Sequence, residues 1–107
     1  MVFLIYRATR EFPEEEMYGL TSQMRKAAVS VSSNIVEGCA RESQGEYLRL
    51  VEIAFGYLRE LHYQLGLSNR LGYSDEHEIS TCESKIVEAE KVLGACFDQC
   101  ANSAGGN

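Results

Sequence analysis

The sequence has little proline and no long apolar run, and both shortages limit the kind of protein it can form. A single proline among 107 residues is too few for a loop-rich or all-β chain, so we expect long helices. No apolar run approaches the roughly 18 residues that a helix needs to cross a bilayer. The N-terminal stretch MVFLIYRATREF places its arginines after a short apolar run, whereas a secretory signal places its charge before a longer one. We therefore expect a cytoplasmic protein that has no membrane partner.

Basic residues are outnumbered, and the imbalance lies in the last third of the chain. The formal net charge is −6, and residues 74–107 hold seven acidic residues against two basic ones. Acidic and basic residues are nearly balanced before position 74. Affinity for nucleic acid comes largely from Lys and Arg side chains that neutralise phosphates. An acidic chain is therefore a poor general binder of nucleic acid, although a local basic face can still exist.

The four cysteines do not have the spacing of a metal site. There is no C-x-x-C pair, and Cys82, Cys96 and Cys100 fall on the apolar seam of the last predicted helix. Buried cysteine commonly packs as a small apolar residue, so we expect core packing for these three and a loop thiol at Cys39. We predict no metal.

Motifs that carry enzymatic chemistry are also missing. A di-iron bundle needs Glu-x-x-His pairs, but Arg59 precedes His62 by three positions and Ser74 precedes His77. No P-loop, dinucleotide fingerprint or nucleophile elbow is present. We therefore expect no cofactor, no small-molecule substrate and no enzymatic activity.

Apolar residues along the chain follow the periodicity of α-helices. Apolar residues recur at three- and four-residue steps in four segments, which is the pattern of amphipathic helices. Pro13 should end the first helix, and Ser43 with Glu46 matches a capping box at the start of the third. Gly38 and Gly72 are predicted to end the second and third helices. The predicted helices cover 2–11, 20–38, about 44–71 and a segment from Asp75 to about 101.

Short loops between long helices favour antiparallel neighbours. We therefore predict an all-α fold: an antiparallel up-down-up-down four-helix bundle with a short first helix. Residues 1–107 should form one domain, with 102–107 as a disordered tail.

Two helices carry more apolar surface than one bundle needs. Val29 and Val36 lie off the main face of the second helix, and a second line follows the third helix. A helix that is apolar on several sides is usually buried on more than one of them, and in a small protein another copy of the chain is the simplest cover. The predicted oligomer interface consists of Val29, Ser32, Ser33, Val36, Ile53, Gly56, Tyr63 and Leu67. An alternative is that the small residues of 28–38 only suit a tight core within one chain.

A polar line runs beside this stripe at four- and three-residue steps. Glu37 and Arg41 form an i,i+4 pair in the favourable order. Either the line is an ordinary solvated face, or it is a polar network at a subunit junction that partly buries Asn34 and Glu37. The polar cluster consists of Ser30, Asn34, Glu37 and Arg41.

Two rival functions remain open. The first is a nucleic-acid-binding module with a basic belt over two helices. The second is a helical ribonuclease, because Arg70 and His77 match the permissive R-x(4–6)-H pattern of HEPN-type enzymes, with Leu71 where a polar residue is usual. The residues of the proposed nucleic-acid contacts are Arg25, Lys26, Arg41, Arg49, Arg59 and Arg70.

Several strings of the sequence resemble a known family. FPEEEMYGLTSQMRKAAVSVSSNIVEG, LRELHYQL and NRLGY are similar to the four helix bundle protein family, also called the 23S rRNA intervening-sequence proteins. The resemblance covers roughly residues 2–95. It implies an antiparallel four-helix bundle that assembles into a ring-like homopentamer and has no known enzymatic activity. Relatives include the accessory variability protein of diversity-generating retroelements, which binds a reverse transcriptase and nucleic acid.

Three departures from the family pattern change these expectations. The first helix of the family usually starts about a dozen residues earlier, so the chain resembles a version truncated at its N-terminus. Ser32 stands where proline is common, which should straighten the second helix. The nucleic-acid-binding relatives are basic, whereas this chain is acidic, which weakens the expectation of nucleic-acid binding. The interpretation that we favour is a non-enzymatic scaffold or adaptor that self-assembles as a homopentamer.

Overall fold

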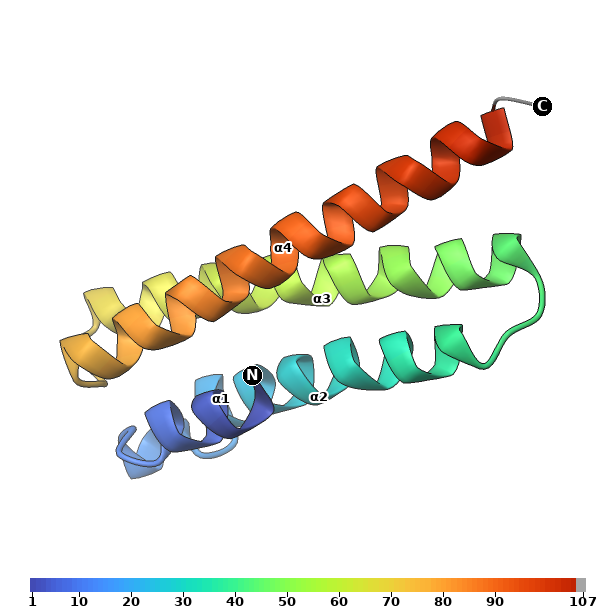
Figure 1. Cartoon of the computed structure of the whole chain (residues 1–107). Coiled ribbons are helices and arrows are strands. Elements are labelled where there is room, and N and C mark those ends of the chain that lie inside the picture. Colours follow the sequence, from blue (N-terminus) through green and yellow to red (C-terminus); the bar gives the residue numbers. More distant parts are fainter. Residues whose placement is uncertain (106–107) are drawn as a thin grey trace.

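The chain folds as a bundle of antiparallel helices (Figure 1). The computed structural model describes the backbone of residues 1–105 and the side chains of residues 1–98. No strand occurs within this part of the chain, so the predicted all-α four-helix bundle is confirmed. The elements are α1 (Val2–Thr9), a short 3₁₀ helix η1 (Glu14–Glu16), α2 (Leu20–Cys39), α3 (Gln44–Arg70) and α4 (Glu76–Gly105).

Helix α3 lies at the centre of the arrangement. Helices α2 and α4 both pack along it, and α1 contacts α2 and α4. Helix α1 has only 8 residues, whereas α3 has 27 and α4 has 30. It therefore covers one end of a bundle that is 51 Å long, and α4 diverges from α3 towards the other end (Figure 1).

Local signals explain where α3 begins and ends. The Ser43 hydroxyl accepts a hydrogen bond of 3.2 Å from the backbone N–H of Glu46, as the capping box predicts. At the other end Gly72 has a φ of 71°, a left-handed conformation that glycine adopts without steric cost. Both predicted boundaries are confirmed.

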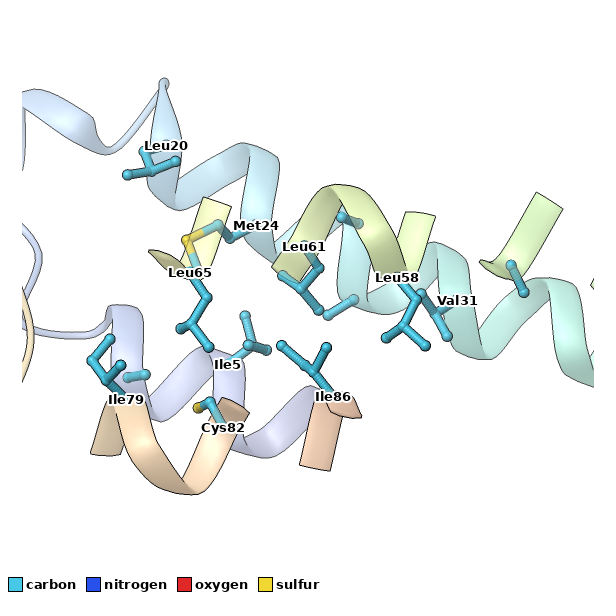
Figure 2. Close-up of a cluster of buried hydrophobic side chains, with 14 of the residues drawn as sticks. Ile5, Leu20, Met24, Val31, Leu58, Leu61, Leu65, Ile79, Cys82 and Ile86 are labelled. Carbon is cyan, nitrogen blue, oxygen red and sulfur yellow. The ribbon is translucent and has the colours of Figure 1, made fainter. Parts of the chain in front are cut away.

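The core is one continuous apolar cluster to which all four helices contribute (Figure 2). Figure 2 shows Ile5 of α1 beside Leu65 of α3 and Ile86 of α4, so the short helix completes the core at its end of the bundle. The predicted main faces of the helices supply most of the cluster. Its buried members are Ile5, Ala8, Phe12, Leu20, Met24, Ala27, Ala28, Val31, Val51, Ala54, Leu58, Leu61, Leu65, Ile79, Cys82, Ile86 and Leu93.

Polar contacts tie the connection after α1 to the turn between α3 and α4. The Tyr73 hydroxyl donates a 2.9 Å hydrogen bond to Glu16, and the Phe12 ring packs on the Tyr73 ring at 5.4 Å between centroids. The hydrogen bond to the Glu16 carboxylate raises the pKa of Tyr73. The Ser74 hydroxyl also donates to the carbonyl of Ala8. These contacts hold α1 against the rest of the bundle.

The prediction that Gly38 ends the second helix is wrong. Helix α2 continues through Cys39, and Gly38 is buried inside its last turn. A Cβ at this position would lie 3.4 Å from the Cβ of Leu50 and 3.5 Å from the ring of Tyr47. The glycine therefore permits a close approach of α2 to α3, which is a second physical use of a residue without a side chain.

The other boundaries differ from the predictions by a few residues. Helix α1 ends at Thr9 rather than at residue 11, because the chain turns there to bury Phe12. Helix α2 passes through Ser32 without interruption. Helix α4 extends to Gly105, so the prediction of a disordered tail is wrong for residues 102–105. No proline interrupts the helix there, and adding residues to a formed helix costs little free energy. Residues 106–107 lie outside the described residues.

None of the described helices combines the length and the apolar character that a membrane span needs.

The cysteines whose side chains are described are free thiols in different surroundings. Cys82 is buried and its thiol approaches the carbonyl of Leu4 at 3.5 Å, as expected of core packing. Cys96 is half-buried and lies 2.9 Å from the hydroxyl of Tyr47. Cys39 is exposed at the end of α2 and not in a loop as predicted. The side chain of Cys100 lies outside the described residues.

We predict opposite effects for alanine at two glycines of the α3 end. Gly72→Ala should lower the free energy of unfolding by about 1–2 kcal/mol, because a Cβ is strained at positive φ. Gly66→Ala should raise it by up to about 1 kcal/mol, because Gly66 lies inside the helix and no atom outside its own helix backbone lies within 4 Å of the added Cβ. Urea denaturation of the two variants measures both effects, and a shift of the same sign in both would contradict the backbone assignment.

We also predict that iodoacetamide modifies Cys39 long before Cys82. Burial raises the pKa of the Cys82 thiol, and the nearby Glu78 carboxylate raises it further, so the reactive thiolate is scarce as well as inaccessible. Peptide mass spectrometry at pH 8 gives the rate at each site. In urea the two rates should converge; equal rates in the folded protein would show that Cys82 is not in the core.

Candidate interaction surfaces

The predicted interface residues form an outer stripe on α2 and α3. Val36 and Tyr63 are 70% and 72% exposed, and Val29, Ile53 and Leu67 are exposed to a smaller extent. Ser33 and Gly56 are exposed, while Ser32 is half-buried. Within the segment 28–38, Ala28, Val31 and Gly38 are buried in the core of their own chain, so the alternative of a tight intrachain core holds for part of the segment and not for its exposed residues. Whether another copy covers the stripe stays a prediction.

Helical geometry places the stripe away from the core. Gly56 and Tyr63 precede the buried Leu58 and Leu65 by two positions, which is a rotation of about 200° around α3. Val29 has the same relation to the buried Val31 on α2. The apolar stripe is therefore a second face and not an extension of the first.

Gly56 is the position in this stripe that the protomer explains least. No atom outside its own helix backbone lies within 4 Å of a Cβ built there, in contrast to Gly38. Glycine inside a helix costs about 1 kcal/mol relative to alanine. The packing of one chain therefore gives no reason for a small residue at this point of α3.

The predicted polar cluster forms two local pairs along α2. The Asn34 side-chain amide donates a 2.7 Å hydrogen bond to the carbonyl of Ser30. Arg41 forms an ion pair of 2.8 Å with Glu37. Asn34 is half-buried, whereas Glu37 is exposed in the protomer. Their joint burial at a subunit junction stays a prediction.

The six basic residues predicted to contact nucleic acid do not gather in one place. Arg25 and Lys26 lie near the start of α2, whereas Arg41 follows its end. Arg49 and Arg70 are exposed at opposite ends of α3, so the set is spread along the length of the bundle. Arg59 lies between them and pairs with Glu90 of α4. The six residues are therefore dispersed along the protomer, and their contact with nucleic acid stays a prediction.

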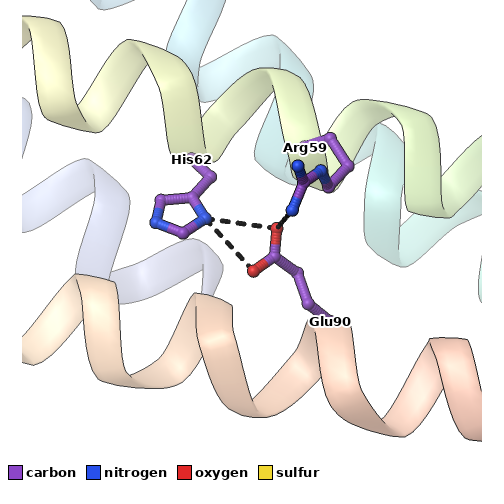
Figure 3. Close-up of polar contacts among 3 residues, drawn as sticks. All are labelled: Arg59, His62 and Glu90. Atoms are coloured by element: carbon purple, nitrogen blue, oxygen red, sulfur yellow. Dashed lines mark hydrogen bonds and ion pairs between the residues drawn. The ribbon is translucent and has the colours of Figure 1, made fainter.

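Glu90 links α3 to α4 by contacts that the sequence pattern did not indicate (Figure 3). Its carboxylate is only 12% exposed and lies 3.2 Å from Arg59 and 3.1 Å from Nδ1 of His62. These residues are about 30 positions apart in the sequence, so no local motif connects them. A largely buried carboxylate needs such partners to offset its loss of hydration. The arrangement fixes how α4 sits on α3.

Sequence reasoning also missed a basic and aromatic surface on α1 and the start of α2. Tyr6 and Arg25 line two adjoining hollows there, and Arg7 of α1 and Arg10, which directly follows α1, line one of them. The only sequence signal was the spacing of Arg7 and Arg10, three positions apart on one side of the first helix. That signal alone does not show that α1 packs beside Arg25.

The predicted ribonuclease pair is not assembled. Arg70 and His77 are both exposed, on either side of the turn between α3 and α4. Among the side chains that the structure describes, no hydrogen bond joins Arg70 to His77. The backbone carbonyl of His77 accepts a hydrogen bond from the Thr81 hydroxyl. A general acid–base pair needs both groups within reach of one substrate atom, and no contact in the described part of the structure orients these two side chains towards a common point.

Potential metal ligands are likewise not assembled. Over the described residues, no three His, Cys, Asp or Glu side chains converge as a cation site requires.

Comparison with known proteins gives a family and a fold. Residues 1–95 match the family described as 23S rRNA-intervening sequence protein. No curated protein matches the chain. A solved structure from Bacteroides thetaiotaomicron, described as a protein with unknown function from the S23 ribosomal protein family, is similar with a TM-score of 0.78 and 20% identity over 90% of this chain and 87% of that one. At this identity the structural likeness concerns the fold, and the family match over most of the chain settles membership: the chain belongs to the 23S rRNA-intervening sequence protein family.

Proposed function

We propose that the chain assembles into a homopentameric ring that serves as a scaffold or adaptor, without catalysing a reaction. The observation that carries this proposal is the outer stripe on α2 and α3. Leaving Val36 and Tyr63 in water forfeits the stabilisation that burial gives, about 25 cal/mol for each Å² of apolar surface. Contact with other copies recovers it. The family resemblance independently implies a ring of five.

The form of the stripe supports a tight helix contact. Gly56 on α3 and Ser33 on α2 are small and exposed, so the backbones of neighbouring helices can approach closely there. The apolar Val36 and Tyr63 would supply buried area around them. The segment 28–38 combines residues of low helix propensity, and contact with neighbouring chains gives such residues a use.

A ring with an odd number of copies requires two different surfaces on each protomer. Head-to-tail contacts close into a ring only if one patch on a chain fits a distinct patch on the next. The line through Val29 and Val36 on α2 and the line through Gly56 and Tyr63 on α3 are two such patches. The proposal pairs the first line of one chain with the second line of its neighbour.

The proposal includes no enzymatic reaction, because no contact between described residues brings together Arg70 and His77, the residues that best match a catalytic pair. A cytoplasmic location is part of the proposal. It fits the free thiols of Cys39, Cys82 and Cys96, since a reducing compartment keeps cysteines unpaired.

We expect Gly56→Gln to break the assembly, whereas Gly66→Gln leaves it intact. Both glycines are exposed inside α3 and neither has an atom of another part of the protomer near its Cβ, so one chain accepts either change. Only Gly56 lies in the outer stripe, where a long side chain would prevent close approach. Light scattering coupled to size exclusion at about 50 µM measures the mass of each variant.

Circular dichroism provides the control, since both variants should keep the helical content of the unchanged chain. A monomer for the unchanged protein at this concentration would defeat the proposal. An assembly of equal mass in both variants would show that the contact does not use this stripe.

A further inference from the structure

Two open hollows adjoin on the surface where α1 packs on α2. The first, of roughly 470 Å³, is lined by residues of α1 and by Arg25. The second, of roughly 430 Å³, follows the start of α2. Tyr6 and Arg25 line both, so the two form one continuous surface. This aromatic–basic surface is defined by Phe3, Tyr6, Arg7, Arg10, Tyr18, Arg25 and Lys26.

The surface collects positive charge in a chain whose net charge is −6. Four cations line the two hollows and no carboxylate does. Among the described residues, Arg41, Arg59 and Lys85 have ion-pair partners, but no carboxylate lies within pairing distance of the four cations here. Acidic residues line the neighbouring hollows, with Glu78 on the side of Arg7 and Glu60 on the side of Lys26. The positive region is therefore local and has acidic borders.

Aromatic rings stand free among these cations. Phe3 is 90% exposed and Tyr18 is 92% exposed, so almost all of both rings faces solvent. Neither ring contributes to the core. Exposed rings beside unpaired cations are the two elements that bind single strands, since bases stack on the rings while phosphates meet the cations.

Arg25 is held in place at the centre of the surface. Its Nε donates a 2.9 Å hydrogen bond to the hydroxyl of Thr9, and its guanidinium lies 4.6 Å from the centroid of the Tyr6 ring. Thr9 is itself fixed, because its hydroxyl donates to the carbonyl of Ile5. The guanidinium is therefore oriented before any ligand arrives, which lowers the entropy lost on binding.

We propose that the aromatic–basic surface binds single-stranded nucleic acid. Phosphates contact the four cations, and unpaired bases stack on Phe3 and Tyr18; the cations are Arg7, Arg10, Arg25 and Lys26. A duplex is a poorer ligand because its bases already stack on one another and do not expose their faces. An acidic peptide would satisfy the cations but has no aromatic bases to stack on the two rings. The surface has no residue in common with the proposed subunit interface, of which only Val29 lines the second hollow, so the inference does not depend on the ring.

The test is fluorescence anisotropy of a labelled 12-nucleotide oligouridine with the full chain in 50 and 200 mM NaCl. Neutralisation of four phosphates gives a slope near −3 in a plot of log affinity against log salt, which is roughly a 50-fold loss between the two salt concentrations. Phe3→Ala and Tyr18→Ala should each weaken binding at least about fivefold, because each removes one stacking contact. Arg10→Gln and Lys26→Gln should each reduce the salt slope by about 0.7.

Matched controls use exposed cations away from this surface. Arg49→Gln on α3 and Lys91→Gln on α4 remove the same charge from residues that also lack a carboxylate partner among those described. They should leave affinity and slope nearly unchanged. Circular dichroism should show all variants folded, since Phe3 and Tyr18 are not in the core, and light scattering in the same buffer reports assembly separately.

Three outcomes would overturn the inference. The first is no binding in 50 mM NaCl. The second is an equal loss in the control variants, which would indicate general charge attraction. The third is equal affinity for a duplex, or for poly-glutamate, with no effect of Phe3→Ala and Tyr18→Ala. That result would identify an acidic partner or general anion binding in place of a single strand.

Discussion

The structure depends on one buried row along α3. Val51, Ala54, Leu58, Leu61 and Leu65 are almost completely enclosed, and α2 and α4 both pack along the helix that carries them. A fully buried aliphatic side chain of this size contributes about 1.5–3 kcal/mol. The positions of α2 and α4 relative to each other follow from their positions on α3, and α1 in turn packs against α2 and α4.

The packing on this row also decides where small residues are needed. Gly38 lets the end of α2 approach Tyr47 and Leu50 at the start of α3. Gly56, two positions before a buried leucine, has no comparable neighbour. The two glycines therefore differ in what they permit. Gly38 allows close packing within the chain, whereas Gly56 faces outwards. The outward one is the reason to look for a second copy.

Much of the fold could be predicted because its signals are local. The apolar spacing of α3, the Ser43 cap and the Gly72 stop each depend on a few neighbouring residues, and all were predicted correctly. Gly38 was misread because a glycine near a helix end suits a left-handed stop as well as a close approach, and only the position of Tyr47 distinguishes them. Periodicity likewise placed Val36 and Tyr63 off the main apolar faces.

The surfaces were less predictable because they combine residues far apart in the chain. Glu90 meets His62 and Arg59 only through the packing of α4 on α3. Arg25 joins Arg7 and Arg10 only because α1 turns back beside α2. Spacing within one helix contains no information about which partner helix lies alongside. The family match adds the fold and leaves these surfaces to be derived from the packing.

Because α1 is short, the number of helices around the core differs between the two ends of the bundle. Near Ile5 four helices enclose the core, whereas beyond the reach of α1 the bundle consists of α2, α3 and a diverging α4 (Figure 1). Local opening costs less where fewer side chains must separate. Fluctuations should therefore concentrate around residues 40–43, and amide protons should exchange fastest there and slowest around Leu61. The end of the bundle near Ile5 is therefore rigid, and the end around residues 40–43 opens more easily.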